Sequence, residues 1–444
     1  MLYPVLQDPL HQIVSSLFDR PRGASIGQML FGAGEQGAWY DVADMSTLFQ
    51  DSAGATPVTA VEQQVGRMLD KSGRGNHATQ ATTTKRPVLS RRVNLFLDTS
   101  TPDASGWIGA NASLVAGRVT PNAVNGQHYI YQAAVAPGSA VMRFTARADG
   151  YPRIMAREGS QTGNFVCFDL VTGSVVSSQT YTGAIQPSAT DPGGFDCTVY
   201  LSGKTNTPEA LAFVVGNDAT NSWGSAAFAG DGVKGVIVKN IHLTLAIDAH
   251  LPYQWVNTAT DYDADPAKFP AYLRFDAVDD ALQTGNIDFT STDKMTAWAG
   301  ITKLSDAARG VVLEISVSAG GNSGVFQMEA PHAAGQNTFL WGSKGTVLPF
   351  VMPVASAPAS RILTGVGDIS GDITSLRVNG VATTASTDQG TGNYGNYPLY
   401  IGARATSSLF FNGRLYSLIV RGAQTPPSQI EATELYIKQK MRMP

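Results

Sequence analysis

The chain has 444 residues, of which 43% are hydrophobic and 15% charged, and its formal net charge is −4. The apolar share excludes a disordered chain, and two cysteines cannot build a disulfide-dense scaffold. Nucleic acid is not expected as a partner, because neutralising phosphates needs a cationic stripe that this sequence lacks. At roughly 100–200 residues per domain, the length predicts two or three domains.

Residues 1–30 are predicted to form an N-terminal attachment segment with a short amphipathic helix over 9–19. Apolar residues recur there at helical spacing, namely Leu10, Ile13, Val14, Leu17 and Phe18. The helix either packs on its own domain or docks on a neighbouring subunit, and composition leaves both open. No cationic region precedes it, and no run of about 18 apolar residues occurs, so we expect no signal peptide and no membrane insertion.

After residue 30, short alternating apolar runs are separated by Gly, Asn, Asp, Ser and Pro about every ten residues, which predicts an all-β fold of sandwiches. Five predicted strands are 141–145, 165–170, 236–243, 311–315 and 415–420. Helical spacing returns at the C-terminus, where Ser428 is the expected cap of a helix. The apolar face of that helix consists of Ile430, Leu435, Ile437 and Met441.

The predicted sandwich that begins around 70–89 continues only at 272–280. The segment between them has an all-β pattern of its own, so we expect one β-sandwich (jelly-roll) domain to be inserted in a loop of the other. The expected boundaries are 1–30, 31–91 plus 266–444, and 92–265.

A set of motifs, which follow one another in a fixed order along the chain, supports this division because it resembles a known family. The motifs are Trp39-Tyr40-Asp41, Asp70-Lys71-Ser72-Gly73-Arg74-Gly75-Asn76-His77, Phe275-Asp276-Ala277-Val278-Asp279-Asp280, Tyr400-Ile401-Gly402 and the strand 411–420. Over about 39–91 and 266–440 the chain resembles the concanavalin A-like (laminin G-like) sandwich of phage and prophage tail proteins. That family commonly has glycine where Ala277 stands, so the resemblance implies a turn of positive φ there.

The insert is similar to the carbohydrate-binding-module-like jelly rolls of the same proteins. The similar residues are Asn94-Leu95-Phe96, Ser105-Gly106-Trp107, the run 168–175 and Leu251-Pro252-Tyr253. The resemblance implies a component of a tail fibre, tailspike or other part of the virion tail, and a homotrimer.

Catalytic residues are not expected. No Gly-x-Ser-x-Gly elbow is present, and we expect His242 to be a satisfied sheet residue and His77 to bond the local backbone. Three acidic clusters lack the carboxylate pattern of the sandwich glucanases: Asp261/Asp263/Asp265, Asp276/Asp279/Asp280 and Asp368/Asp372. The second cluster is expected to fix a turn by accepting backbone N–H groups.

No cofactor and no metal residue are assigned. Calcium is the alternative, because Asp279 and Asp280 together with Asp368 or Asp41 would supply hard oxygen ligands. No motif of fixed spacing supports it. Cys167 is expected to be a buried strand residue, and its pairing with Cys197 is left open.

Surface recognition remains, and five residues in turn-rich contexts are predicted to contact a ligand: Trp107, Trp223, Tyr394, Asn396 and Tyr397. The loop-like run 390–397 is the first choice for an exposed contact surface. The alternative for each aromatic ring is burial in a core.

The expected function is therefore that of a non-catalytic phage virion tail component, a tail fibre, tip or receptor-binding protein, that attaches to a host surface glycan. Its other partners would be tail or baseplate proteins, bound through residues 1–30. It would be made in the host cytoplasm and act in the virion. The alternatives are a glycan-depolymerising tailspike enzyme, disfavoured because no β-helix repeat is visible, and a purely structural connector or decoration protein.

Overall fold

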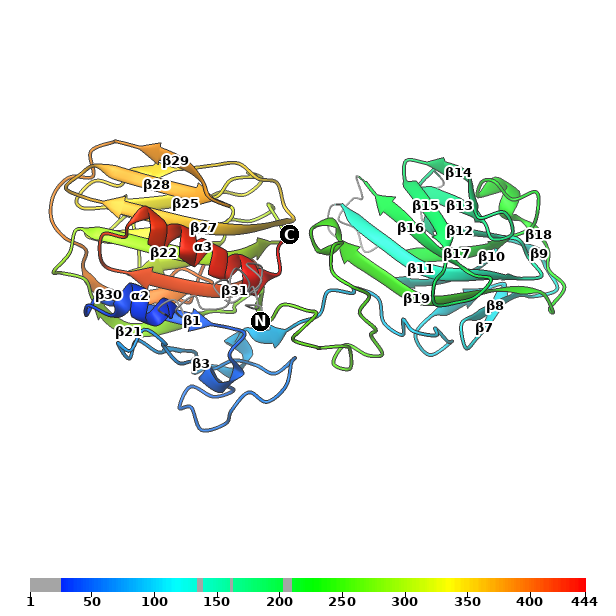
Figure 1. Cartoon of the computed structure of the whole chain (residues 1–444), viewed down its shortest axis with the longest axis horizontal. Helices are drawn as coiled ribbons and strands as arrows, with labels where there is room; N and C mark the ends of the chain where they lie inside the picture. Colours follow the sequence, from blue (N-terminus) through cyan, green and yellow to red (C-terminus); the bar gives the residue numbers. More distant parts are fainter. Residues whose placement is uncertain (1–24, 134–138, 160–162, 203–209) are drawn as a thin grey trace, which may run out of the picture.

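A computed structural model describes residues 25–133, 139–159, 163–202 and 210–444, so the helix predicted at 9–19 lies outside the described residues. The described chain forms two β-sandwiches that lie side by side (Figure 1). The predicted all-β class is confirmed. All five predicted strand runs also lie within or largely within strands of this structure.

The first sandwich pairs an eight-stranded sheet with a nine-stranded sheet. The eight-stranded sheet has the order β29-β28-β27-β22-β31-β20-β5, with β1 beside β31. Its strands are β1 (Gly37–Asp41), β5 (Val88–Ser90), β20 (Tyr272–Asp276), β22 (Lys294–Lys303), β27 (Ala359–Asp368), β28 (Ile373–Val378), β29 (Val381–Ala385) and β31 (Asn412–Arg421).

The nine-stranded sheet has the order β2-β3-β4-β21-β30-β23-β24-β25-β26. Its strands are β2 (Leu48–Phe49), β3 (Arg67–Met68), β4 (Ala78–Thr79), β21 (Leu282–Asp288), β23 (Val311–Ile315), β24 (Val325–Glu329), β25 (Leu340–Lys344), β26 (Phe350–Val351) and β30 (Asn396–Ile401).

Segments from both ends of the sequence share this sandwich. Leu89 of β5 lies opposite Leu273 of β20 in an antiparallel pair, and both side chains are fully buried in one hydrophobic cluster. Gln80 of the early segment also donates to the backbone oxygen of Ala281. The chain therefore leaves the sandwich after β5 and returns to it at β20, while the proposed domain boundaries themselves stay a prediction.

The second sandwich lies between these two points in the sequence. One six-stranded sheet has the order β14-β13-β12-β17-β10-β6, and the other has the order β15-β16-β11-β19-β8-β7. The first contains β6 (Ile108–Ala110), β10 (His128–Ala133), β12 (Arg153–Glu158), β13 (Phe165–Asp169), β14 (Ser174–Gln179) and β17 (Ala210–Gly216). The second contains β7 (Ala112–Val115), β8 (Arg118–Pro121), β11 (Ala140–Asp149), β15 (Thr182–Pro187), β16 (Phe195–Leu201) and β19 (Gly235–Leu245).

Side chains alternate across these strands, so each sheet has an inner and an outer face. The inner faces enclose a core around Trp107, Phe144, Phe168 and Phe213. A short ribbon of β9 (Asn125–Gly126) and β18 (Phe228–Ala229) lies at the end of this sandwich that is farther from the first one (Figure 1).

Two helices cover the outer face of the eight-stranded sheet: α2 (Ile26–Phe31) and α3 (Pro427–Met441) (Figure 1). Helix α3 begins at Pro427, where the missing N–H costs nothing, so Ser428 lies in its first turn and is not the cap. Gly300 of β22 permits the close approach of α3, because a Cβ atom there would lie 2.5 Å from Cγ2 of Ile437. Among the described residues, no helix is both long enough and apolar enough to cross a bilayer.

Helix α2 is part of the packed sandwich. Leu30 and Phe31 are buried, and the buried side chain of Arg421 donates from Nε to the backbone oxygen of Leu30 at 2.7 Å. The last residues of the predicted attachment segment 1–30 therefore pack on the chain's own sheet, because their apolar side chains complete its outer cluster.

The two sandwiches contact each other through a buried ion pair. Arg414 of β31 donates from Nη1 to Oδ2 of Asp248 at 2.7 Å, and both side chains are less than 10% exposed. The Arg414 guanidinium also lies over the ring of Tyr272, 4.7 Å from its centroid. The segment that follows β19 is thereby fixed to the eight-stranded sheet.

Candidate functional site

A β-bulge on the outer face of the sheet β15-β16-β11-β19-β8-β7 brings the main candidate residues together. Arg143 lies opposite His242, whereas Thr145 lies opposite Lys239, so two residues of β19 face Phe144 alone. Asn240 occupies the bulge at φ 50, a left-handed conformation that asparagine tolerates. Bulges of this kind change the direction of side chains, and here Arg143 and His242 become cross-strand neighbours.

These residues line a cavity of about 350 Å³, which we call the bulge cavity. Most of the residues that line it carry a polar group, and the lining consists of Arg143, Phe144, Thr145, Gln186, Thr190, Asp196, Cys197, Thr198, Asn240, His242 and Tyr253. Hydroxyl, amide, carboxylate, guanidinium and imidazole groups thus converge on one cavity, and convergent polar groups are what orient a ligand in a small-molecule site.

Arg143 and His242 form the buried part of the bulge cavity. Arg143 Nη2 lies 3.0 Å from Nδ1 of His242 and also donates to the backbone oxygen of Leu251 at 3.0 Å. A guanidinium only donates, so Nδ1 must accept and the imidazole proton must be on Nε2. Within the described chain, that Nε2 and the Nε of Arg143 are buried without a hydrogen-bond partner.

Burial and charge keep His242 neutral. The side chain is 1% exposed, and burial together with the Arg143 charge lowers its pKa to about 3. Burial also lowers the pKa of Arg143, and Arg143 forms no ion pair with the described carboxylates. The cavity therefore presents N–H donors and a positive charge that no described protein group neutralises.

Other lining residues supply hydrogen-bond acceptors to the bulge cavity. Asp196 accepts a hydrogen bond from Thr145 Oγ1 at 3.0 Å, and the Tyr253 hydroxyl pairs with Thr99 Oγ1 at 3.1 Å. The Tyr253 ring is perpendicular to the His242 imidazole, with centroids 5.7 Å apart. A ligand with both hydroxyl and acceptor oxygens matches this mixture of groups.

Two of the five predicted ligand contacts are not accessible. Trp107 is 2% exposed in the core of the second sandwich, where it packs against Phe96 and Phe213. Tyr394 is 1% exposed and its hydroxyl pairs with Ser343. The expected exposure of both rings is wrong, because each phenyl or indole surface fills a core while its polar atom finds a partner inside.

The other three lie at two separate places. Asn396 is exposed and Tyr397 half-buried at the start of β30 in the first sandwich, and the Tyr397 hydroxyl donates to the backbone oxygen of Ser323 at 3.3 Å. Trp223 is half-buried in the second sandwich, with Arg157 stacked 3.7 Å from its ring centroid. The five residues therefore do not form one site, and the ligand contacts of these three stay a prediction.

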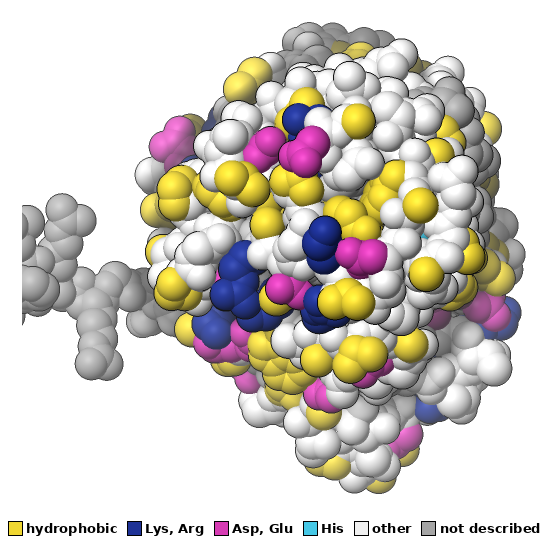
Figure 2. Space-filling model, turned by 90° about the vertical axis from the view of Figure 1, so that its right-hand side faces the viewer, with side chains coloured by type: hydrophobic (Ala, Val, Ile, Leu, Met, Phe, Trp, Pro, Cys, Tyr) yellow, Lys and Arg dark blue, Asp and Glu magenta, His cyan; other side chains and the backbone are white. Residues whose placement is uncertain are grey.

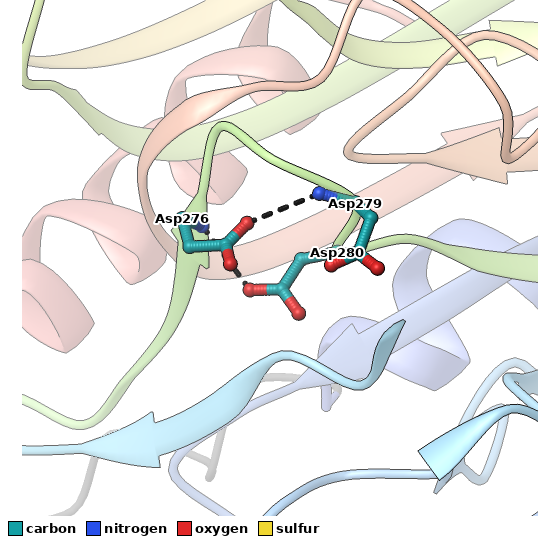
Figure 3. A group of neighbouring side chains, drawn as sticks. All are labelled: Asp276, Asp279 and Asp280. Carbon is teal, nitrogen blue, oxygen red and sulfur yellow. Dashed lines mark hydrogen bonds between the residues drawn. The ribbon is translucent and has the colours of Figure 1, made fainter. Parts of the chain in front are cut away.

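The acidic turn behaves as expected. Asp276 Oδ1 accepts the backbone N–H groups of Val278 and Asp279 at 2.8 and 3.3 Å, and Asp280 Oδ2 accepts that of Asp276 at 3.1 Å. Figure 3 shows the three carboxylates close together, and the structure places their oxygens within 4.8 Å of one another. Ala277 adopts φ 67, as the resemblance implied, and burial followed by the Asp276 charge raises the pKa of Asp280 to about 7.

Neither of the further calcium ligands considered joins this turn. Asp368 forms an ion pair with Lys294, and Asp41 accepts from Tyr436 and Lys440 at 2.9 Å each. Both carboxylates have partners elsewhere in the first sandwich, so neither Asp368 nor Asp41 joins Asp279 and Asp280 in the acidic cluster of the described residues. The carboxylates of Asp276 and Asp280 fix the bend, and a cation at this cluster stays a prediction.

The predictions for the two histidines had different outcomes. His77 accepts from the backbone N–H of Asp70 at 3.0 Å, as expected, whereas His242 is satisfied at one nitrogen only. Cys167 and Cys197 are buried and free. Arg143 and Asp196 were not predicted from the sequence. The pattern of β19 does indicate a bulge, because its core residues alternate as Val236 and Val238 and then, one position out of step, as Ile241 and Leu243.

At the far end of the second sandwich, charged side chains of both signs are mixed among the described residues. Figure 2 shows Lys and Arg beside Asp and Glu there, among scattered hydrophobic side chains. Ion pairs such as Arg118 with Asp149 at 2.5 Å and Lys234 with Asp231 at 3.7 Å lie on this sandwich. A polyanionic partner is not favoured by such a surface.

No family model and no curated protein matches the chain. Among solved structures, the CBM40 of the Ruminococcus gnavus IT-sialidase is similar at 14% identity and a TM-score of 0.27, covering 34% of this chain and 97% of that one. The receptor binding domain of botulinum neurotoxin mosaic serotype C/D is similar at 10% identity and 0.30, covering 37% and 42%. The NanB sialidase from Streptococcus pneumoniae is similar at 12% and 0.28, covering 36% and 27%. Similarity of this extent carries no argument about function.

Proposed function

We propose that the protein is a non-catalytic component of a phage virion tail that binds a saccharide of the host surface in the bulge cavity. The tail context rests on the resemblance of the first sandwich to phage tail proteins. The binding role rests on the chemistry of the cavity.

One observation carries the binding role: beside a cavity of about 350 Å³, Arg143 Nε and His242 Nε2 are buried N–H groups that have no partner among the described residues. A buried donor left unpaired costs on the order of 1–3 kcal/mol. An acceptor oxygen placed in the cavity would recover part of this cost. Hydroxyl and ring oxygens of a saccharide supply such acceptors, and saccharide hydroxyls can in turn donate to Asp196.

The acid content of the cavity supports binding without hydrolysis. Glycosidases use two carboxyl groups about 5–10 Å apart, whereas Asp196 is the single acid among the residues that line the cavity. Elsewhere, Glu314 and Glu329 are fully buried. They are neutralised by Arg404 at 2.7 Å and Arg309 at 2.5 Å respectively, so a substrate would not meet a free carboxylate pair there.

The binding role is tested with the full-length protein on a glycan array and by calorimetry with the glycans that bind. We expect Arg143→Met and Thr198→Val to weaken binding by about tenfold or more. Arg118→Met is the matched control, because Arg118 is an arginine of the same sheet that does not line the cavity. Thermal unfolding of each variant identifies loss of fold. Equal affinity of wild type and Arg143→Met, or new reducing ends in the incubated glycan, would contradict the proposal.

The tail context is tested on purified phage particles. Antibodies against the second sandwich should label the tail and block adsorption to host cells. Because α2 is packed on the sandwich, the attachment role falls to residues 1–24. Particles that lack the protein but adsorb normally would favour the connector alternative. The proposed homotrimer is tested by the mass of the purified protein in solution.

A further inference from the structure

A second cavity lies on the other outer face of the second sandwich. It has a volume of about 220 Å³ and is lined by Tyr129, Tyr131, Arg157, Gly159 and Ala212. Except for Gly159, which directly follows β12, these residues belong to the sheet β14-β13-β12-β17-β10-β6, whereas the bulge cavity lies on the opposing sheet. The hydrophobic core of the sandwich separates the two.

Cross-strand register explains the shape of this cavity. Ala212 of β17 lies opposite Tyr131 of β10 on one side and opposite Arg157 on β12 on the other. Strands are about 4.8 Å apart, so the Cα atoms of Tyr131 and Arg157 are separated by roughly 10 Å. The small Ala212 side chain leaves the space between these two long side chains open.

The walls of the cavity are aromatic on one side and cationic on the other. Tyr129 and Tyr131 have ring centroids 5.9 Å apart, and Trp223 and Tyr129 form a T-shaped pair with centroids 5.7 Å apart. Trp223 also stacks on the Arg157 guanidinium, which donates to the backbone oxygen of Gly159 at 2.9 Å. Arg157 is only 4% exposed, so its position is fixed before any ligand binds.

We propose that Tyr129, Tyr131 and Arg157 form a second saccharide site that takes one pyranose ring over Ala212, on the opposite face of the sandwich from the bulge cavity. The saccharide class rests on the proposed function. The C–H face of a pyranose packs on tyrosine rings, as apolar surfaces do, and its hydroxyl edge faces the guanidinium and phenol groups. The Arg157 charge disfavours a cationic ligand.

Two separate sites on the second sandwich would let one protein molecule bind two stretches of glycan at once. Binding at the second site is then intramolecular and strengthened by a high effective concentration. The bulge cavity would select a saccharide by polar contacts. The site of Tyr129, Tyr131 and Arg157, which we call the Tyr131 site, would hold a sugar ring by stacking.

The test uses full-length protein that carries Trp255→Phe. Trp255 is 39% exposed, whereas Trp39, Trp107, Trp298 and Trp341 are each below 10%, so Trp223 becomes the tryptophan most open to quenching. Chitohexaose, cellohexaose and a hexamer of galacturonate are titrated at up to millimolar concentration. We expect at least one to change the Trp223 emission, and Ala212→Leu to weaken that binding by about tenfold or more. Ala229→Leu, at an exposed alanine of β18, is the matched control.

The outcomes separate this proposal from that for the bulge cavity. Arg143→Met should leave the Trp223 response unchanged while it lowers binding measured by calorimetry. In one outcome, Ala212→Leu abolishes the Trp223 response, whereas Arg143→Met changes neither this response nor the binding measured by calorimetry. That outcome would contradict saccharide binding in the bulge cavity and would support the Tyr131 site. No response to any of the three hexasaccharides, or equal loss of the response in Ala212→Leu and Arg143→Met, would overturn the Tyr131 site.

Discussion

Arg143 Nη2 lies 3.0 Å from His242 Nδ1, and this contact fixes the imidazole proton on Nε2. The N–H donor that results is buried beside the bulge cavity and has no hydrogen-bond partner in the part of the chain that the structure describes. Protonation of His242 would place a second positive charge against the guanidinium, on a side chain that is buried from solvent. The pair therefore favours a neutral histidine over a wide range of pH.

A pH-dependent stability follows from His242. Its pKa is about 3 when folded, against the ordinary 6.5, so the unfolded state binds more protons between these values. The free energy of unfolding should then fall as pH falls from about 6.5 toward 3. The variant His242→Gln should show a shallower fall over this range in chemical denaturation. Parallel curves for the two proteins would show that His242 titrates normally.

Asp280 should act in the opposite direction. Its pKa is raised to about 7 by burial and by the Asp276 charge, so the folded state binds more protons between the ordinary value near 4 and 7. Stability should therefore fall as pH rises through this interval. Asp280→Asn should raise the midpoint of thermal unfolding at about pH 8 and change it little at about pH 4. Asp279→Asn, at the more exposed neighbour, is the control.

The packing of α3 on the sheet gives a stability prediction without charges. A Cβ atom at Gly300 would lie 2.5 Å from Ile437 and 2.9 Å from Sδ of Met441, so the helix or these two side chains must shift. Overpacking of this kind costs roughly 1–3 kcal/mol, and Gly300→Ala should lower the denaturant midpoint accordingly. Gly285→Ala is the matched control, because no atom lies within 4 Å of its Cβ position. Equal effects of the two substitutions would mean that α3 does not pack closely on Gly300.

The sequence predicted the strands better than it predicted the site. Alternation in runs such as 141–145 and 311–315 reflects burial of one sheet face, a local property that a single sequence contains. Whether an aromatic ring in a polar, glycine-rich run is buried depends on distant strands. Tyr394 is covered because Ser343 of β25 and Phe326 of β24 pack against it, and nothing near residue 394 in the sequence indicates this.

The bulge cavity could not be predicted for a related reason. Arg143 and His242 are separated by 99 residues, and only the register of β11 against β19 makes them neighbours. The phase change in β19 indicates that a bulge exists, but not which strand lies opposite it. By contrast, the turn at 276–280 was predicted correctly, because its hydrogen bonds join residues two to four positions apart.

Truncation tests how many N-terminal residues can be removed without loss of stability. Removing residues 1–31 takes away the buried side chains of Leu30 and Phe31 and the backbone oxygen that Arg421 Nε contacts at 2.7 Å. Burial of two such side chains stabilises by about 1.5–3 kcal/mol each, and an unpaired buried guanidinium N–H adds a further cost. The protein lacking residues 1–31 should therefore unfold at a lower denaturant concentration than the protein lacking residues 1–24. Identical midpoints for the two truncated proteins would contradict the packing of α2 on the sandwich.

The contact between the two sandwiches provides the last prediction. Arg414 and Asp248 are paired at 2.7 Å with 6% and 7% of their side chains exposed, so removal of one partner leaves a buried charge alone, at a cost of about 3–5 kcal/mol. Asp248→Ala should destabilise more than the double variant Asp248→Ala/Arg414→Met, because the double variant removes both charges. Chemical denaturation of the wild type, both single variants and the double variant gives the coupling energy between the two residues. A coupling energy near zero would mean that the ion pair does not hold the segment after β19 against the first sandwich, and limited proteolysis at 246–270 should then proceed equally in all four proteins.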